Sequence, residues 1–250
     1  MVHAREAGFP CRASLLPPKE QARRPVTPLT GRFSFVSKPG SMGNRIRRES
    51  PFMGYVIPPP PPIAIPVAGT SDLFPVRRIW CVGRNYAAHA REMGGDPNKE
   101  PPFFFAKTGD AVVVSGSSIP YPSLTSNLHH EVELVVALKS GGQDLSPAQA
   151  LDCVYGYAVG IDLTRRDLQE LAKKSGRPWE IGKSFDRSAP IGLIHPATQT
   201  GHPTKGVIRL QVNGQQKQTG DLSDMIWQVP DVLSHLSQLV RLEAGDLIFT

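Results

Sequence analysis

The chain has 250 residues, enough for one large domain or two small ones. Of these residues 40% are hydrophobic and 20% charged, which are ordinary values for a globular protein. Its net charge of +6 comes from residues 1–52, which carry ten Lys and Arg and three Asp and Glu. The remaining residues carry 18 Lys and Arg and 19 Asp and Glu, so no nucleic-acid-binding face is expected on the folded part. No apolar run approaches the ~18 residues that span a bilayer, and three widely separated cysteines favour a reducing compartment over a disulfide framework.

Residues 1–70 are predicted to form a basic, Pro-rich extension without regular structure. The segment shows neither helical nor strand periodicity and contains a run of five prolines at positions 58–62. It lacks the compact apolar core of a secretory signal. Prolines at positions 10, 17, 18, 25 and 28 would interrupt the amphipathic helix of a mitochondrial presequence. A cytoplasmic location is therefore favoured over a mitochondrial one.

Residues 71–250 are predicted to form the folded domain. Its first half contains a strand that ends at Gly83 and a short helix that ends at Gly94-Gly95. The segments in chain order are a strand over 76–83, a helix over 85–93, two strands joined by a turn within 101–113, and a strand over 130–138.

The second half of the domain contains two helix–strand units and a hairpin. Ser146 is predicted to cap a helix, a strand follows over 157–163, and a second helix runs from Arg165 to near Gly176. Asn213-Gly214 predicts a hairpin turn, and a last helix is followed by Gly245 and a final strand. Strands dominate, helices are irregularly spaced, and there is no internal repeat or dinucleotide-type glycine motif, which favours the α+β class.

Two carboxylates, Glu131 and Glu133, stand two residues apart in the strand over 130–138. Side chains i and i+2 of a strand point to the same face, so this pair is either a solvated face or an anionic site. Asp162, at the end of the next apolar strand, would supply a third oxygen ligand for a hard cation such as Mg²⁺ or Mn²⁺. Its alternative role is to cap the helix that follows.

Other polar residues can likewise be interpreted either as site residues or as ordinary structural or surface residues. Arg166 and Gln169 share a helix face, where the planar fork of Arg166 suits a substrate carboxylate or a solvated surface equally. Lys183 lies at an apolar-to-polar transition near the expected anionic cluster, or at the surface. His89 and Glu92 are spaced as a base with its orienting carboxylate, or as a structural pair.

Taken together, the ordered segments resemble the fumarylacetoacetate hydrolase family, and most of all its single-domain fumarylpyruvate and acylpyruvate hydrolases. The resemblance covers about residues 75–250, and its segments are "IWCVGRNYAAHAREMG", "FFFAKTGDAVV", "NLHHEVELVVAL", "YGYAVGIDLTRRDLQ", "PWEIGKSFDRSAPIG", "VNGQQKQTGDLSDMIWQVP" and "LEAGDLIFT". It implies a mixed β-sheet roll, usually dimeric. In this family a Gly-Thr-Pro-x-Gly-Val-Gly loop follows "GDLIFT", so the domain is expected to be C-terminally truncated at Thr250.

The resemblance also implies roles for the candidate residues. Glu131, Glu133 and Asp162 would bind Mg²⁺ or Mn²⁺, and His89 with Glu92 would activate a water. Lys183 would act in catalysis, and Arg166 and Gln169 would contact the substrate.

The expected function is metal-dependent hydrolysis of a C–C bond in a 2,4-dioxo acid of aromatic catabolism, fumarylpyruvate or an acylpyruvate, to pyruvate and a carboxylic acid. The expected partner is therefore a small molecule, with neither nucleic acid nor membrane, and the enzyme is expected to be a homodimer. One alternative is an oxaloacetate decarboxylase or a 2-hydroxy-diene-dioate isomerase, which needs a substrate enolate but no attacking water. The alternative from another class is a non-catalytic metal-binding fragment.

Overall fold

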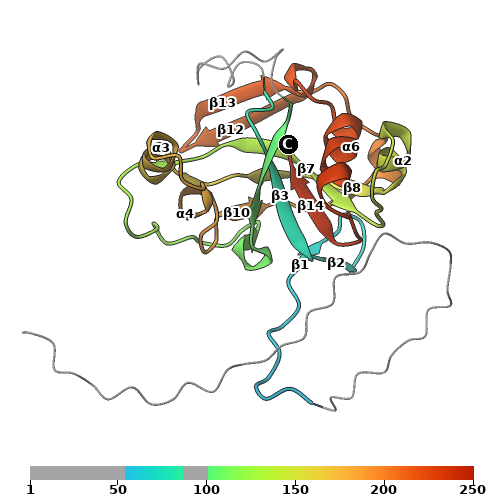
Figure 1. Ribbon diagram of the computed structural model, residues 1–250, viewed down its shortest axis with the longest axis horizontal. Coiled ribbons are helices and arrows are strands. Elements are labelled where there is room, and N and C mark those ends of the chain that lie inside the picture. The colour runs from blue at the N-terminus through green and yellow to red at the C-terminus, as the bar shows by residue number, and fades with distance from the viewer. Residues whose placement is uncertain (1–53, 87–100) are drawn as a thin grey trace, which may run out of the picture. The chain divides into compact units, whose positions relative to one another are not determined.

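The computed structural model describes residues 54–86 and 101–250 (Figure 1). Most of the predicted extension and most of the predicted helix over 85–93, with His89 and Glu92, lie outside the described residues. Among the described residues, none of the helices has the length and hydropathy that a membrane span requires. Cys81 and Cys153 are buried and free, whereas Cys11 lies outside the described residues.

An eight-stranded mixed sheet forms the centre of the fold. Most neighbours run antiparallel, but the β14–β3 and β10–β5 pairs are parallel. This mixed sheet with few helices confirms the predicted α+β class. In spatial order the strands are β4 (Phe103–Lys107), β3 (Arg78–Gly83), β14 (Asp246–Phe249), β7 (Val132–Leu138), β8 (Val154–Ile161), β10 (Ala189–Ile191) and β5 (Val112–Val114), with β11 (His195–Pro196) also paired to β8.

Three small two-stranded sheets and several helices surround the central sheet. The small sheets are β1 (Ala64–Pro66) with β2 (Leu73–Pro75), β6 (Leu128–His129) with β9 (Thr164–Arg165), and β12 (Val207–Val212) with β13 (Gln215–Asp221). The helices are α2 (Pro147–Asp152), α3 (Arg166–Lys174), α4 (Glu180–Lys183), α5 (Ala197–Thr200) and α6 (Val229–Leu239), with 3₁₀ turns η1 (Gly109–Ala111) and η2 (Leu222–Asp224). Helices α2 and α6 pack together at one end of the sheet, and α3 and α4 pack together at the other (Figure 1).

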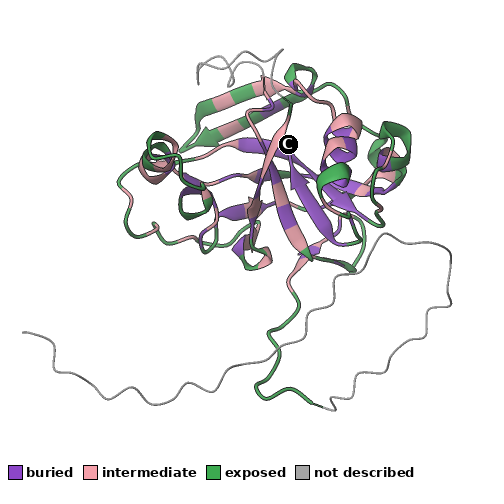
Figure 2. Ribbon diagram, viewed as in Figure 1, coloured by how far each residue is buried: buried purple, intermediate pink, exposed green. Residues whose placement is uncertain are grey.

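Apolar cores cover both faces of the sheet, so its central strands are purple in Figure 2. Strand β7 is buried at all seven positions and divides by alternation. Val132, Leu134 and Val136 enter the core beneath α6, whereas Val135 enters the opposite core with the β1–β2 hairpin. This division is the one that strand geometry predicts, because consecutive strand residues point in opposite directions.

The structure contains the helix cap and the hairpin turn that the sequence predicts, each of which depends on residues close together in the chain. The Ser146 side chain accepts a hydrogen bond from the backbone N–H of Gln149 and caps α2 as predicted. Asn213 and Gly214 both have positive φ, 53° and 76°, which closes the β12–β13 hairpin.

The β1–β2 hairpin spans the predicted boundary at residue 70. Residues 64–66 therefore form a strand inside the segment that was expected to lack regular structure. Ile65 of this strand is fully buried. A three-residue strand after a run of prolines has too little pattern of its own, and its pairing with β2 and the core stabilises it instead.

Candidate active site

The three predicted metal ligands meet where β7 begins and β8 ends. The strands are antiparallel, and the pairing of Val132 with Ile161 brings these two ends together. The backbone N–H of Asp162 donates to the carbonyl of Glu131 at 2.8 Å. One carboxylate oxygen from each of Glu131, Glu133 and Asp162 lies within 4.8 Å of the others. The sheet register therefore assembles three oxygen ligands from positions up to 31 residues apart.

Lys183 lies between two of these carboxylates. Its Nζ donates to Oε2 of Glu131 at 2.5 Å and to Oδ2 of Asp162 at 2.7 Å. Burial alone lowers the pKa of Lys183, but the charges of Asp162 and the two glutamates outweigh burial and raise it above the ordinary lysine value. The ammonium group therefore stays charged and holds the cluster together. It is supplied by α4, a single turn for which the sequence analysis predicts no helix.

Arg166 and Gln169 lie beside the same cluster on the first turn of α3. Nη1 of Arg166 donates to Oε1 of Gln169 at 2.7 Å, and Nη2 lies 2.5 Å from Oε1 of Glu131. Both side chains are buried, unlike solvated helix residues. The predicted i, i+3 pair is thus directed into the site, with its guanidinium oriented by a neutral amide and a carboxylate.

Lys107, at the end of β4, is a site residue that the sequence alone does not single out. Its side chain has no exposed surface, and its Nζ lies 2.8 Å from Oδ1 of Asp162. The same ammonium donates to the carbonyl oxygens of Leu163, at 3.2 Å, and of Lys183. The available signal was a lysine that ends the apolar run "FFFA", because a charge in such a strand must find a partner when it is buried.

Glu133 is the least compensated of the three carboxylates. Its residue is buried, and Oε2 has no hydrogen-bond partner. Burial raises the pKa of Glu133 well above its ordinary value, and the charges of Asp162 and Glu131 raise it further. A buried carboxylate oxygen without a donor, among two other carboxylates, suits a hard divalent cation. The donor set therefore fits Mg²⁺ or Mn²⁺.

Two adjoining cavities open on this cluster. The smaller, about 30 Å³, is lined by the three carboxylates together with Arg84, Tyr86, Arg166, Gln169, Trp179, Lys183 and Thr250, among others. The larger, about 600 Å³, shares Tyr86, Glu131, Glu133 and Arg166 and extends between the start of β7 and the β12–β13 hairpin.

The hairpin that walls the larger cavity is attached through Gln218. Its side-chain amide accepts from the backbone N–H of Val132 at 2.7 Å and donates to the carbonyl of the same residue at 3.3 Å.

The structure brings together six of the eight predicted site residues: Glu131, Glu133, Asp162, Arg166, Gln169 and Lys183. The other two, His89 and Glu92, lie outside the described residues.

Comparison with known proteins supports one family. The family model described as "Fumarylacetoacetate (FAA) hydrolase C-terminal" matches residues 78–250. A solved fumarylpyruvate hydrolase from Pseudomonas aeruginosa, in complex with Mn²⁺ and pyruvate, is similar at TM-score 0.76 and 53% identity, covering 78% of this chain and 86% of that one.

Relatives with other activities are similar too. A mitochondrial oxaloacetate tautomerase from Homo sapiens is 41% identical over 183 residues, 70% of this chain and 82% of the tautomerase. The solved 5-carboxymethyl-2-hydroxymuconate delta-isomerase from Mycobacterium smegmatis has TM-score 0.62 and 29% identity, covering 76% of this chain and 70% of that one.

Proposed function

Since this chain belongs to the fumarylacetoacetate hydrolase family, we propose that it hydrolyses a C–C bond in a 2,4-dioxo acid, fumarylpyruvate in the favoured case, to pyruvate and a carboxylic acid. The observation that carries the proposal is 53% identity to a fumarylpyruvate hydrolase whose structure contains Mn²⁺ and pyruvate. The described site supports it, because the same cavity combines an oxygen-ligand cluster with buried cations for an anionic substrate.

Glu131, Glu133 and Asp162 would hold the divalent metal, Mg²⁺ or Mn²⁺. When bound, such an ion supplies Lewis-acid stabilisation of the negative charge that develops on a substrate oxygen.

The cations of the chain would bind and orient the substrate. Arg166, whose two Nη groups are held by Gln169 and Glu131, provides fixed positive charge toward an anionic group of the dioxo acid. Lys183 provides fixed positive charge beside the cluster, where the enolate of the pyruvyl fragment would form. Because these groups are buried and oriented before the substrate arrives, little reorganisation is needed during the reaction.

The hydrolytic step needs a base, and we assign that role to His89, oriented by Glu92. The base removes a proton from water as the water oxygen adds to the C4 carbonyl. The C3–C4 bond then breaks, its electron pair remains on C3 as the pyruvate enolate, and C3 takes up a proton. The oxygen from water stays with the released carboxylic acid. The larger cavity, about 600 Å³, has room for the acyl group that is released.

A second candidate is favoured by the curated relatives, which are named as oxaloacetate tautomerases. Tautomerisation moves a proton between carbon and oxygen of a four-carbon diacid and consumes no water. The same cluster of carboxylates and cations would serve it, because both reactions place negative charge on the oxygen of a 2-oxo acid. Decarboxylation of oxaloacetate would use the same enolate.

The deciding experiment compares fumarylpyruvate, acetylpyruvate and oxaloacetate as substrates of the Mn²⁺-loaded chain, with chelator-treated protein as the blank. We expect hydrolysis of fumarylpyruvate with the highest kcat/KM. His89→Ala should lower kcat for hydrolysis by about 10²–10⁴-fold and leave KM within a few-fold. His195→Ala, on β11, serves as the matched control. Fast oxaloacetate tautomerisation without hydrolysis of either dioxo acid would favour the second candidate.

The proposal extends to organisation and location. We propose a catalytic domain that comprises residues 71–250 together with β1 and forms a homodimer, preceded by a basic extension. Sedimentation analysis tests the dimer. The extension favours the cytoplasm, whereas the similar tautomerases are named as mitochondrial. Imaging of the full chain with a fluorescent C-terminal fusion distinguishes the two locations.

A further inference from the structure

Arg84 has an unusual backbone at the edge of the smaller cavity. Its φ is +60°, in the left-handed region that residues other than glycine rarely adopt. Such strain persists only where the surrounding structure imposes it, and it gathers at functional sites. Arg84 directly follows β3 and lines the cavity that contains the three carboxylates.

The packing next to Arg84 places this residue against the ring of Phe103. Gly83 pairs with Phe103 across β3 and β4, and a Cβ on Gly83 would lie 1.9 Å from the Phe103 ring. The chain therefore leaves β3 beneath that ring, at a position where a larger residue would displace the ring. The guanidinium carbon of Arg84 lies 5.9 Å from the centre of the same ring, a cation–π contact that directs the side chain.

The charge of Arg84 is not compensated within the part of the chain that the structure describes. The other cations of the cavity each face a carboxylate: Lys183 contacts Glu131 and Asp162, and Arg166 contacts Glu131. Arg84 forms no ion pair with a described residue, and its Nε is buried without a hydrogen-bond partner. Buried donors without partners are rare enough in folded proteins to require a reason.

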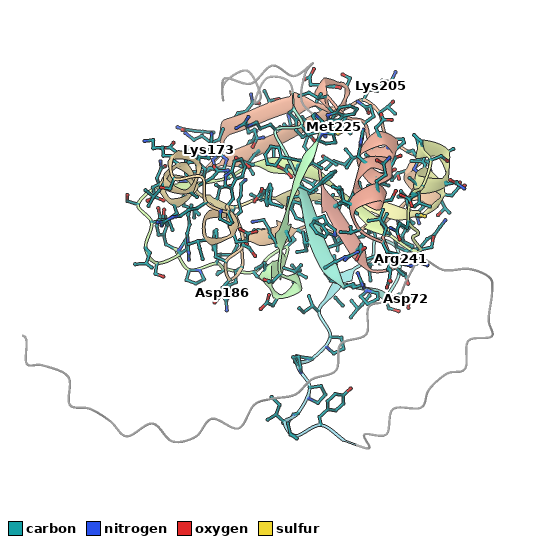
Figure 3. All side chains as sticks on the ribbon, in the orientation of Figure 1. Asp72, Lys173, Asp186, Lys205, Met225 and Arg241 are labelled. Carbon is teal, nitrogen blue, oxygen red and sulfur yellow. The ribbon has the colours of Figure 1, made fainter. Side chains whose placement is uncertain are left out.

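The electrostatic surroundings of Arg84 are positive. Lys173 of α3, labelled in Figure 3, has a pKa lowered first by burial and then by the charges of Arg84 and Arg166. Repulsion between these like charges raises the free energy of the ligand-free protein, and an anion bound beside Arg84 would reduce it.

We propose that Arg84 is a substrate-binding residue that holds the carboxylate of the 2-oxo acid. This inference rests on the proposed function, since it names the substrate group that the site takes. A guanidinium suits a carboxylate because its planar N–H donors match two oxygens at once. Arg166 already donates to Glu131 and Gln169, whereas the donors of Arg84 are free among the described residues.

The test is a pyruvate titration of the full, Mn²⁺-loaded chain, followed by tryptophan fluorescence, because Trp179 lines the same cavity. Arg84→Gly removes the guanidinium and accepts a φ of +60°. Arg187→Gly is the matched control, since Arg187 is an exposed arginine with φ +61° that does not line either cavity described above. Methyl pyruvate, which lacks the negative charge, is the second ligand.

We expect Arg84→Gly to weaken pyruvate binding by about 10–150-fold, the range for a hydrogen bond to a charged group. Arg187→Gly should leave it unchanged, methyl pyruvate should bind both variants alike, and Mn²⁺ affinity by calorimetry should not move. Arg84→Lys, which keeps the charge but loses the fork, should fall between wild type and Arg84→Gly, and it decides the question if Arg84→Gly does not fold.

Pyruvate affinity within twofold of wild type in Arg84→Gly would overturn the inference. So would an equal loss for pyruvate and methyl pyruvate, because the guanidinium would then act through packing, and so would a wild type that does not bind pyruvate. A wild type that binds pyruvate through Arg84 but hydrolyses neither dioxo acid would instead overturn the proposed hydrolase and leave the role of Arg84 standing.

Discussion

Replacement of Lys107 by methionine should destabilise the metal-free protein and strengthen its response to metal. Methionine matches the lysine side chain as far as its ε carbon but lacks the ammonium, which lies 2.8 Å from Oδ1 of Asp162 in a side chain without exposed surface. Removal of one partner from a buried ion pair costs about 3–5 kcal/mol. Asp162 keeps its contact with Lys183, so we expect the lower end, about 3 kcal/mol. For a domain of this size that lowers Tm by about 6–12 °C.

A divalent metal should reverse much of this loss. The ion would replace the positive charge that Asp162 loses. It would also no longer be repelled by the ammonium of Lys107, so that Lys183 remains as the buried lysine beside it. Two unit charges 4 Å apart interact by about 4 kcal/mol at an effective dielectric constant of 20. We therefore expect Mn²⁺ to bind Lys107→Met at least about tenfold more tightly than wild type, with a correspondingly larger increase in Tm.

The assay is thermal unfolding followed by circular dichroism, in chelator and then in a series of MnCl₂ concentrations. Lys205→Met, at an exposed lysine labelled in Figure 3, is the control and should melt like wild type. The reasoning would be refuted if Lys107→Met in chelator melted within 2 °C of wild type. It would also be refuted if Mn²⁺ raised the Tm of Lys107→Met no more than that of wild type.

Three further changes test separate parts of the structure. Gly83→Ala places a Cβ 1.9 Å from the Phe103 ring, so chemical denaturation should show a loss of about 1–3 kcal/mol, typical of overpacking, and an unchanged midpoint would contradict the packing. Glu133→Gln removes a buried carboxylate that has an unpartnered oxygen and two carboxylate neighbours. Its Tm in chelator should equal or exceed that of wild type, while calorimetry should show Mn²⁺ affinity lower by at least about 100-fold. A fall in both the Tm and the Mn²⁺ affinity would argue against metal binding as the reason for this carboxylate. Burial raises the pKa of Tyr157 above its ordinary value of 10.0, so the unfolded chain releases this proton first and the free energy of unfolding falls as pH rises above 10. Tyr157→Phe should lose less stability over that alkaline range. Equal losses of stability in the two proteins would refute the raised pKa of Tyr157.

The sequence by itself determined the features that depend on neighbours along the chain. Alternation in a strand places Glu131 and Glu133 on one face and Val132, Leu134 and Val136 on the other. Helical spacing likewise places Arg166 and Gln169 together, and each relation follows from backbone geometry over at most four residues.

Only the tertiary structure decided which of these groups meet. Asp162 reaches Glu131 because the register of β7 on β8 pairs Val132 with Ile161, and the sequence does not state a register. Lys107 and Lys183 come from β4 and α4, which approach the cluster from other parts of the chain. Lys107 is not singled out by its sequence neighbours, and Lys183 taken by itself could equally be a surface lysine. They become buried ion pairs because a charge enclosed in the core must be neutralised by whatever carboxylate the fold brings beside it.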